Sequence, residues 1–364
     1  MGSLAALALF CIVGSCAYSQ ETFDSLAAKA AAAREANDLT NAMGLYRQAL
    51  VLKPDWAEGW WFLGSLAYDT DQYAAGQQAL TEFVKFEDKA AGWSLLGLCE
   101  FETGAYSHSL KHIRHALDMG DRVPPEMLPA LRFHEAELLT NAGLFDQALQ
   151  KYIWFAHRGT SNSALYSAIG LAALRTRLLP KDIPPAKQDL FSVAGLTAYR
   201  WMATDFQAAE AGFQTLLDRY PSAPNVHYLY GSYLLPSGPD QAMTQFMQEL
   251  QVNPTSADAR AMIALEFVQH EDLNGALPYA RQAIADTLAP PLAHYVYGLI
   301  LTRMGDVRDG VEHLEQAARL DPANLEYHMA LATTYSKLGR AQDSLRERQR
   351  SIAMAREGDA NASR

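Results

Sequence analysis

Cysteine is scarce in this sequence, with three residues in 364. Two of them, Cys11 and Cys16, lie near the start, which leaves Cys99 alone in the rest of the chain. A single cysteine excludes an intramolecular disulfide in that part of the protein. The stability of the fold must therefore come from the way its side chains pack.

Positive charge is also in short supply. The chain has 30 Lys and Arg residues against 41 Asp and Glu residues, a formal net charge of −11. An acidic chain with scattered basic residues is a poor match for a phosphate backbone, so we expect no nucleic-acid partner. Hydrophobic residues make up 49% and charged residues 20%, which is typical of a folded rather than a disordered chain.

Motifs for catalysis and cofactor binding are missing. The chain has no G-x-S-x-G, no G-x-x-x-x-G-K-[ST], no H-E-x-x-H and no pair of C-x-x-C motifs. We therefore predict no catalytic residues, no cofactor and no metal site, and interpret the protein as a non-enzyme.

Long hydrophobic runs are absent, apart from a short one at Leu4–Val13. It is well below the roughly 20 residues of a membrane-spanning helix and suits the apolar part of a signal peptide. Ala17 and Ser19 are small residues at the spacing that signal peptidase reads. Residues 13–16, by contrast, resemble a lipobox in which Cys16 would be lipidated. No Lys or Arg precedes the run, so a first helix that packs on the fold, or a misplaced start codon, is the alternative. We expect 1–19 to be a signal peptide.

What the sequence does contain is a repeat. Residues 60–80 read WWFLGSLAYDTDQYAAGQQAL, and residues 90–117 read AAGWSLLGLCEFETGAYSHSLKHIRHAL, with Leu96-Gly97 where the first segment has Leu63-Gly64. Small residues recur at matching places along the chain, mostly 33 or 34 residues apart. Such residues allow two helix backbones to approach closely. Glycines at 104, 143, 305 and 339 stand where a helix would end in a left-handed turn.

This pattern resembles the tetratricopeptide repeat, a helix–turn–helix unit with the signature W-x2-L-G-x2-Y…A-x3-F…P. The resemblance implies an all-α fold, a right-handed superhelix (α-solenoid) of stacked units. We count about nine units, with these boundaries: 23–56, 57–89, 90–120, 129–160, 190–222, 223–256, 257–290, 291–324 and 325–356.

The period breaks at 161–189. A helix-forming run, SNSALYSAIGLAALRTRLL, has no second helix behind it, and KDIPPAKQ follows, where two prolines exclude an α-helix. We therefore predict an N-terminal stack (23–160), an orphan helix with a proline loop (161–189), a C-terminal stack with a polar cap (190–356) and a disordered tail (357–364). A linker of no special role and a lid or hinge are both open interpretations of the break.

One histidine cluster has the spacing of metal ligands. His108, His112 and His115 lie at i, i+4 and i+7 and share a helix face. Two imidazoles one turn apart bind zinc or copper when a third ligand converges. No Cys or carboxylate completes the site by sequence, so we interpret the strip as a solvated face. Cys99, in the partner helix, is expected to be buried.

A second face of the first helices is the candidate binding surface. It lies about 130° from the small-residue face, at about 100° per residue. In tetratricopeptide arrays this face lines a concave groove. Here it carries seven aromatic residues that we predict to bind a partner: Trp61, Tyr68, Phe101, Phe133, Trp201, Tyr228 and Tyr295.

A carboxylate clamp is disfavoured. The Lys/Asn/Arg combination with which some family members hold a C-terminal carboxylate does not occur in this register. The opening units carry Ala27, Ala31, Phe62 and Ser65 there.

These features predict a scaffold or adaptor that docks a protein or peptide segment in an aromatic groove. Resemblance to exported bacterial family members implies a periplasmic or envelope-associated protein in envelope assembly or export, with secretion as the alternative. A glycan- or peptidoglycan-binding protein is the second hypothesis, since aromatic faces also stack on sugars. An enzyme with a site near the loop at 180–185 is the third.

Overall fold

A computed structural model describes residues 21–285 and 288–362 of the chain. Throughout these ranges the secondary structure is helical, with nineteen α-helices, three single-turn 3-10 helices and no strand. None of the described helices is both long and apolar enough to cross a membrane. The predicted signal peptide, with Cys16, lies outside the described residues.

The chain divides into two compact units, the first ending at Leu131 and the second beginning at Arg132. The division into repeat stacks on either side of 161–189 stays a prediction. The first unit contains α1 (Phe23–Glu35), α2 (Leu39–Leu52), α3 (Ala57–Asp69), α4 (Tyr73–Phe86), α5 (Ala90–Glu102), α6 (Tyr106–Asp118) and η1 (Gly120–Arg122). Helix α7 (Leu128–Ala142) begins in the first unit and ends in the second.

The second unit contains α8 (Phe145–Ala156), α9 (Ser163–Ala173), η2 (Pro180–Asp182), η3 (Pro185–Lys187), α10 (Gln188–Met202), α11 (Phe206–Arg219), α12 (Val226–Leu234), α13 (Pro239–Val252), α14 (Ala257–Gln269), α15 (Leu273–Ala283), α16 (Pro291–Met304), α17 (Val307–Leu320), α18 (Leu325–Lys337) and α19 (Ala341–Ala362). The eighteen described α-helices other than α9 form nine consecutive hairpins, each matching one predicted repeat. The predicted all-α array of about nine hairpins, interrupted near 161–189, is confirmed.

Local sequence explains where the helices start and stop. Asp205 and Asp272 cap α11 and α15, where each side-chain oxygen accepts a hydrogen bond from a backbone N–H of the first turn. Four first helices end at a glycine with positive φ, from +72° to +103°, namely Gly104, Gly143, Gly305 and Gly339. Since a side chain is strained in that conformation, the glycines fix these turns as the sequence predicts.

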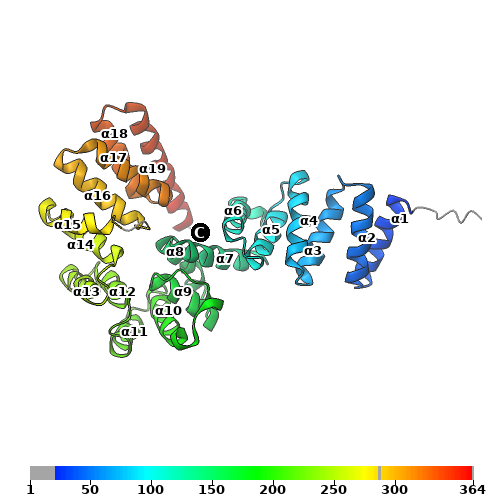
Figure 1. The fold of residues 1–364 in the computed structure, drawn as a ribbon, viewed down its shortest axis with the longest axis horizontal. Coiled ribbons are helices and arrows are strands. Elements are labelled where there is room, and N and C mark those ends of the chain that lie inside the picture. The colour runs from blue at the N-terminus through cyan, green and yellow to red at the C-terminus, as the bar shows by residue number, and fades with distance from the viewer. Residues whose placement is uncertain (1–20, 286–287, 363–364) are drawn as a thin grey trace, which may run out of the picture. The chain divides into compact units, whose positions relative to one another are not determined.

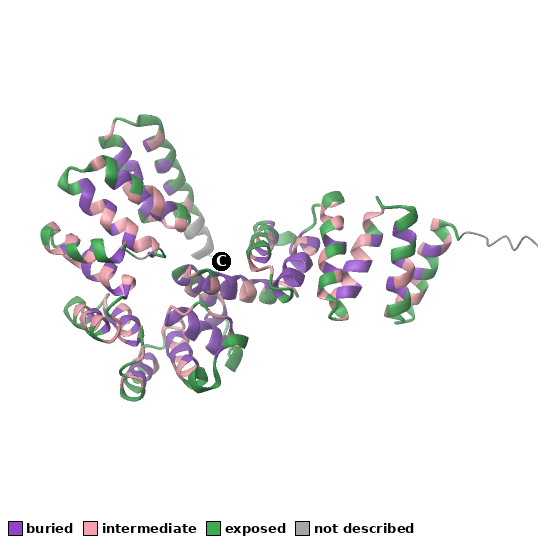
Figure 2. Ribbon diagram, in the orientation of Figure 1, coloured by how far each residue is buried: buried purple, intermediate pink, exposed green. Residues whose placement is uncertain are grey.

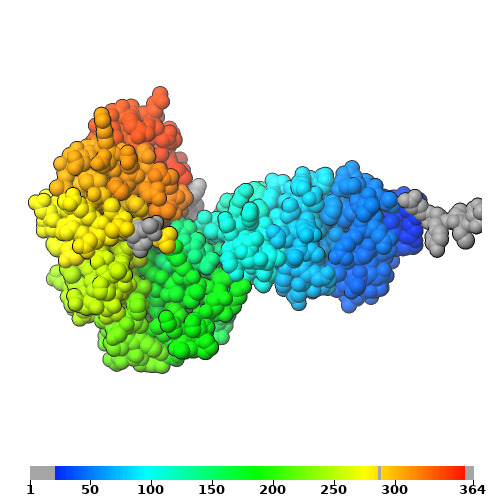
Figure 3. Space-filling model, viewed as in Figure 1, coloured from blue at the N-terminus to red at the C-terminus, as the bar shows by residue number. Residues whose placement is uncertain are grey.

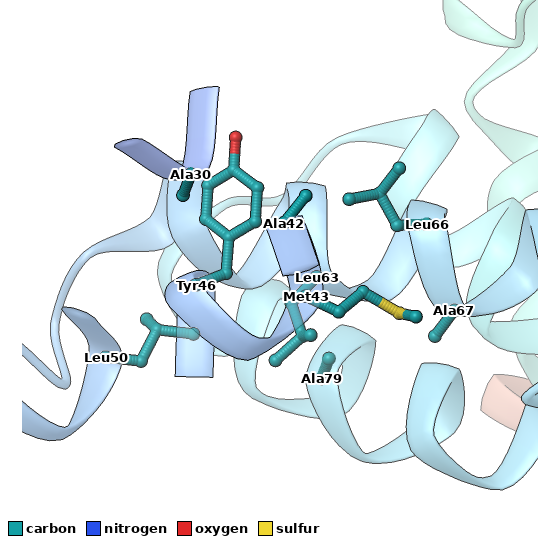
Figure 4. Packing of buried hydrophobic residues seen from close by; sticks show 9 residues of the cluster. All are labelled: Ala30, Ala42, Met43, Tyr46, Leu50, Leu63, Leu66, Ala67 and Ala79. Atoms are coloured by element: carbon teal, nitrogen blue, oxygen red, sulfur yellow. The ribbon is translucent and has the colours of Figure 1, made fainter. Parts of the chain in front are cut away.

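Each hairpin buries an apolar stripe against its partner and its neighbours. In the first two hairpins Tyr46, Met43, Leu50, Leu63 and Leu66 interdigitate with alanines at the helix crossings (Figure 4). The glycine of the repeat signature is needed there, because a Cβ on Gly64 would lie 2.6 Å from the Leu80 Cγ. The buried residues of Figure 2 follow these stripes, and in Figure 3 the hairpins of the first unit form consecutive bands.

Helix α9 has a partner, although no second-type α-helix follows it. It packs against α10 so closely that the two backbones touch. A Cβ on Gly170 would lie 1.9 Å from the backbone carbonyl oxygen of Phe191, and a Cβ on Gly195 would lie 1.7 Å from the backbone carbonyl oxygen of Tyr166. The expected orphan helix is therefore paired with the next first helix. The proline loop between them contains only the single turns η2 and η3.

The chain end also differs from the prediction. The disordered tail was expected from residue 357, whereas α19 continues to Ala362. The preceding sequence, AMARE, consists of residues that favour helix, and it carries the helix past the expected end of the last repeat.

Candidate partner-binding site

In the first unit, Trp61 on α3 borders an open pocket. The indole is half-buried and lies 5.4 Å from the Phe83 ring, centroid to centroid. These two rings, with Ala57 and Ala91, form the apolar walls of a cavity of about 330 Å³. Three charged residues complete its lining: Glu58, Glu87 and Lys89. The Lys89 Nζ lies 3.4 Å from a Glu87 oxygen, so these two charges balance each other. The negative charge of Glu58 is then the net charge of the pocket lining.

The other two predicted aromatics of this unit lie elsewhere on its first helices. Tyr68 follows Trp61 on α3 and lies near the C-terminal end of that helix. It is half-buried, and burial raises the pKa of its hydroxyl. Phe101 on α5 is only 7% exposed, so it is chiefly a core residue. Of the three, Trp61 has the accessible apolar face that an anchor site requires.

In the second unit, three predicted aromatics pack against other rings. Phe133 on α7 lies 6.4 Å from Tyr152 and 6.2 Å from Phe155 of α8. Trp201 on α10 lies 5.7 Å from Tyr233, and Tyr295 on α16 lies 4.9 Å from Tyr327. Each predicted residue is half-buried. These contacts join neighbouring helices and do not gather the three side chains into one strip.

Tyr228, the remaining predicted residue, is 6% exposed and belongs to a buried ionic cluster around Arg175. The Arg175 Nη2 donates hydrogen bonds to the Tyr228 hydroxyl (2.5 Å) and to an Asp146 oxygen (2.7 Å). The Arg175 Nη1 lies 3.4 Å from an Asp258 oxygen. Burial raises the pKa of the Tyr228 hydroxyl, so it is a neutral partner in this cluster.

The cluster keeps the guanidinium charged inside the protein. Burial lowers the pKa of Arg175, but the Asp146 and Asp258 carboxylates outweigh it and leave the value raised. Burial likewise raises the pKa of Asp258, an effect that the positive charge of Arg175 opposes. A buried charge of this kind persists only when it is paired and hydrogen-bonded.

Residues 143–147, called the α7–α8 turn here, comprise the loop after α7 and the first residues of α8. They line a cavity together with residues of α12, α14, α16 and α18, and α8 lies on the inner side of the second unit (Figure 1). Besides the bond from Asp146 to Arg175, the Gln147 Nε2 donates to an Asp321 oxygen at 2.9 Å, across 174 residues of sequence. Two cavities, of about 240 and 340 Å³, remain beside the turn. The predicted groove of this unit is therefore partly occupied by the chain itself.

One feature of the sequence points to this cluster. Every first helix except α12 is followed by a residue with positive φ, and that residue is Gly, Asn, Asp, Thr or Glu except after α9, where it is Arg175 at φ +50°. Such a conformation costs a residue with a side chain about 1–2 kcal/mol. A long basic side chain at a position that favours glycine indicates that the side chain itself has a role.

The histidine strip lies on α6, against Trp93 of α5. His112 Nδ1 is 2.8 Å from a Glu100 oxygen, and His115 Nε2 is 3.3 Å from an Asp88 oxygen, which also accepts the Trp93 indole N–H. His108 is exposed. No group of three His, Cys, Asp or Glu side chains within the described ranges is arranged to hold a metal ion.

Cys99 is fully buried beside this strip, as the sequence predicts. Burial raises the pKa of its thiol to about 12, so the thiolate is not available near neutral pH. The residue fills space between α4 and α5, where its Sγ lies 2.8 Å from the place that a Gly76 Cβ would take.

Comparison with known proteins identifies the repeat. Residues 301–360, covering the last turn of α16 through most of α19, match the family model of the tetratricopeptide repeat. No curated protein matches the chain.

Several solved structures are similar in part. MamA from Desulfovibrio magneticus RS-1 is 19% identical, over 46% of this chain and 95% of that one, with a TM-score of 0.37. Cut9, solved with Hcn1 in an APC/C hetero-tetramer, is 14% identical over 93% and 80%, with a TM-score of 0.36. Yeast Tom70 is 14% identical over 92% of both chains, with a TM-score of 0.35. At these scores the likenesses do not bear on function.

The assignment depends on the match at 301–360 and on the recurrence of helical hairpins in the described residues before it. Residues 301–360 match the tetratricopeptide repeat, and the earlier hairpins have the same helix–turn–helix form.

Proposed function

We propose that the protein is a non-catalytic interaction scaffold whose first unit binds a peptide segment of a partner protein at Trp61. The observation that carries this proposal is the open cavity of about 330 Å³ between Trp61 and Phe83. A cavity of this size takes one large apolar side chain, and a buried aromatic anchor contributes about 2–4 kcal/mol to binding.

Charge supports a partner segment that joins an apolar residue to a Lys or Arg. The pocket rim carries Glu58 and Glu87 against Lys89. Asp69 and Glu102, at the ends of α3 and α5, are exposed and have the same sign. Complementary charge of this kind raises the association rate and rejects acidic segments.

A displayed library of random dodecapeptides, selected on the full-length protein, tests the proposal. We expect the enriched sequences to combine an apolar residue with a basic one. Titrated against variants, they should lose at least about fivefold in affinity with Trp61→Ala, or about 1 kcal/mol. The control, His108→Ala, changes an exposed residue of the histidine strip and should leave affinity within twofold.

Two outcomes would remove the binding site from Trp61. One is unchanged affinity in Trp61→Ala, and the other is a loss in His108→Ala alone. A glycan array probed with the same proteins covers the alternative: carbohydrate binding that disappears in Trp61→Ala, without peptide enrichment, would favour a glycan-binding protein.

Two further proposals concern the whole protein. Trp201 and Tyr295 of the second unit are proposed to bind a partner segment as well, which predicts a loss of affinity for that segment with Trp201→Ala. Export is proposed from the sequence of residues 1–19, and mass spectrometry of the mature chain should find a start at Gln20 or a lipidated Cys16. An intact Met1 would contradict export and the proposed envelope role.

A further inference from the structure

The inner side of the second unit has a different character from the Trp61 pocket. We propose that the α7–α8 turn, residues 143–147, is a built-in occupant of this surface, and that an external segment with the same chemistry binds in its place. The chemistry is that of Leu144, Phe145, Asp146 and Gln147: an apolar residue, an aromatic ring, a carboxylate and an amide.

The receiving surface is held together without the turn. Arg175 is bonded to Tyr228 of α12 and lies beside Asp258 of α14. The Asn225 side-chain amide, at the start of α12, donates to the Leu174 carbonyl at 3.0 Å. The end of α9 is therefore anchored to α12 and α14, and the guanidinium stays in place if the turn departs.

Two polar contacts attach the turn to this surface, one through Asp146 and one through Gln147. Asp146 pairs with Arg175 but its side chain is 64% exposed, so the solvent screens the pair. Gln147 supplies the bond to Asp321. Phe145 is buried, with its ring centroid 5.6 Å from the Arg175 Cζ. Loss of either polar contact would therefore weaken the attachment of the turn to this surface.

The surface also has unused binding capacity. The cavities of about 240 and 340 Å³ share Gly143, Leu144, Phe145, Pro290 and Pro291 in their linings, so both border the turn. A longer external segment would bury apolar surface in both. The turn has the advantage of high effective concentration, which lowers the apparent affinity of any competitor.

Arg175 explains why the competitor should carry a carboxylate. The Arg175 Nε is buried and has no hydrogen-bond partner, and Asp146 is bound through Nη2. A carboxylate that approaches side-on accepts from Nε and Nη2 together, the bidentate geometry that arginine favours. An external segment can therefore satisfy a donor that the built-in occupant does not.

A binding assay with a single probe tests this inference. The probe is an acetylated, amidated, fluorescein-labelled peptide of residues 142–151, AGLFDQALQK, titrated by anisotropy into the full-length protein. Asp146→Asn weakens the built-in contact and should lower the Kd of the peptide at least about tenfold relative to wild type. The control Asp218→Asn, an equal change at an exposed site on α11, should leave the Kd unchanged.

Two further measurements locate the binding. Adding Arg175→Gln to Asp146→Asn should abolish the gain, and a peptide with Asn in place of the Asp should bind at least about tenfold more weakly. Circular dichroism melting of every variant shows whether it is folded; Gln147→Ala, which removes the bond to Asp321, serves as a second loosened variant and should show the same gain.

The inference is overturned if wild type and both loosened variants bind the peptide equally or not at all, or if the gain survives Arg175→Gln. Trp61→Ala should leave this binding unchanged. The outcome is therefore separate from that of the Trp61 proposal, which concerns the first unit.

Discussion

Trp61 and Tyr228 lie on equivalent faces of two different copies of the repeat. The surface at Trp61 is an open pocket, whereas the surface at Tyr228 is filled by other side chains of the chain. At Trp61 the walls are apolar and the charges lie at the rim. At Tyr228 the same face meets Arg175, Asp146 and Asp258, and the α7–α8 turn lies against it. The comparison shows that a repeat register predicts which face is available, but the irregular segment between repeats decides whether it is used internally.

The break at 161–189 causes the difference. It replaces a second helix with a loop, so that α9 packs directly on α10 through two glycines. That arrangement presents the end of α9, with Arg175, to α12 and α14. In the described part of the first unit α1, α3 and α5 are each followed by their own second helix.

The largest expected effect comes from the α9–α10 crossing. Gly195→Ala places a Cβ 1.7 Å from the backbone carbonyl oxygen of Tyr166. Unlike a side chain, this oxygen cannot move away by changing its rotamer. We expect a loss of at least about 4 kcal/mol in unfolding free energy, above the usual range for overpacking. Gly64→Ala in the first unit meets a Leu80 side chain at 2.6 Å, which can adjust, and should cost about 1–3 kcal/mol. Urea denaturation measures both; equal losses would contradict the special role of this crossing.

The next effect separates buried from exposed ion pairs. Arg175→Met leaves Asp258 without its cation in the protein interior and should destabilise the second unit by about 3 kcal/mol. Lys89→Met breaks the exposed pair with Glu87 at the Trp61 pocket and should cost less than about 1 kcal/mol. Hydrogen exchange resolved by unit measures each loss. A small effect for Arg175→Met would show that the cluster does not hold α9 to α12 and α14.

Much of this architecture could be predicted from the sequence. The spacing of Gly64, Gly97 and their equivalents defined nine hairpins, because close helix crossings tolerate few residue types. The partner of α9 was missed, since Gly195 lies only 25 residues after Gly170 and so outside the spacing of 33 or 34 residues. A search for residues at a regular spacing in the sequence does not detect a helix crossing whose glycines depart from that spacing.

The candidate site was harder to predict. Helical phase assigned Trp61 and Tyr228 to the same face of their repeats. Burial, however, depends on what lies opposite, and for Tyr228 this is Arg175, 53 residues away in the sequence. Phe101 lies on the same face and is nevertheless buried in its own unit. The position of a residue in the helical period specifies on which face of its own helix it lies, whereas its exposure depends on the neighbouring helices.

Hydroxyl-radical footprinting with and without the 142–151 peptide tests most directly the claim that one surface is open and the other is occupied by the chain. In the free protein Trp61 should be oxidised and Phe145 protected. Excess peptide should increase oxidation of Phe145 in the tryptic fragment 133–151 of the protein and leave that of Trp61 unchanged. Phe145 that stays protected while the peptide is bound, or a change confined to Trp61, would contradict the account.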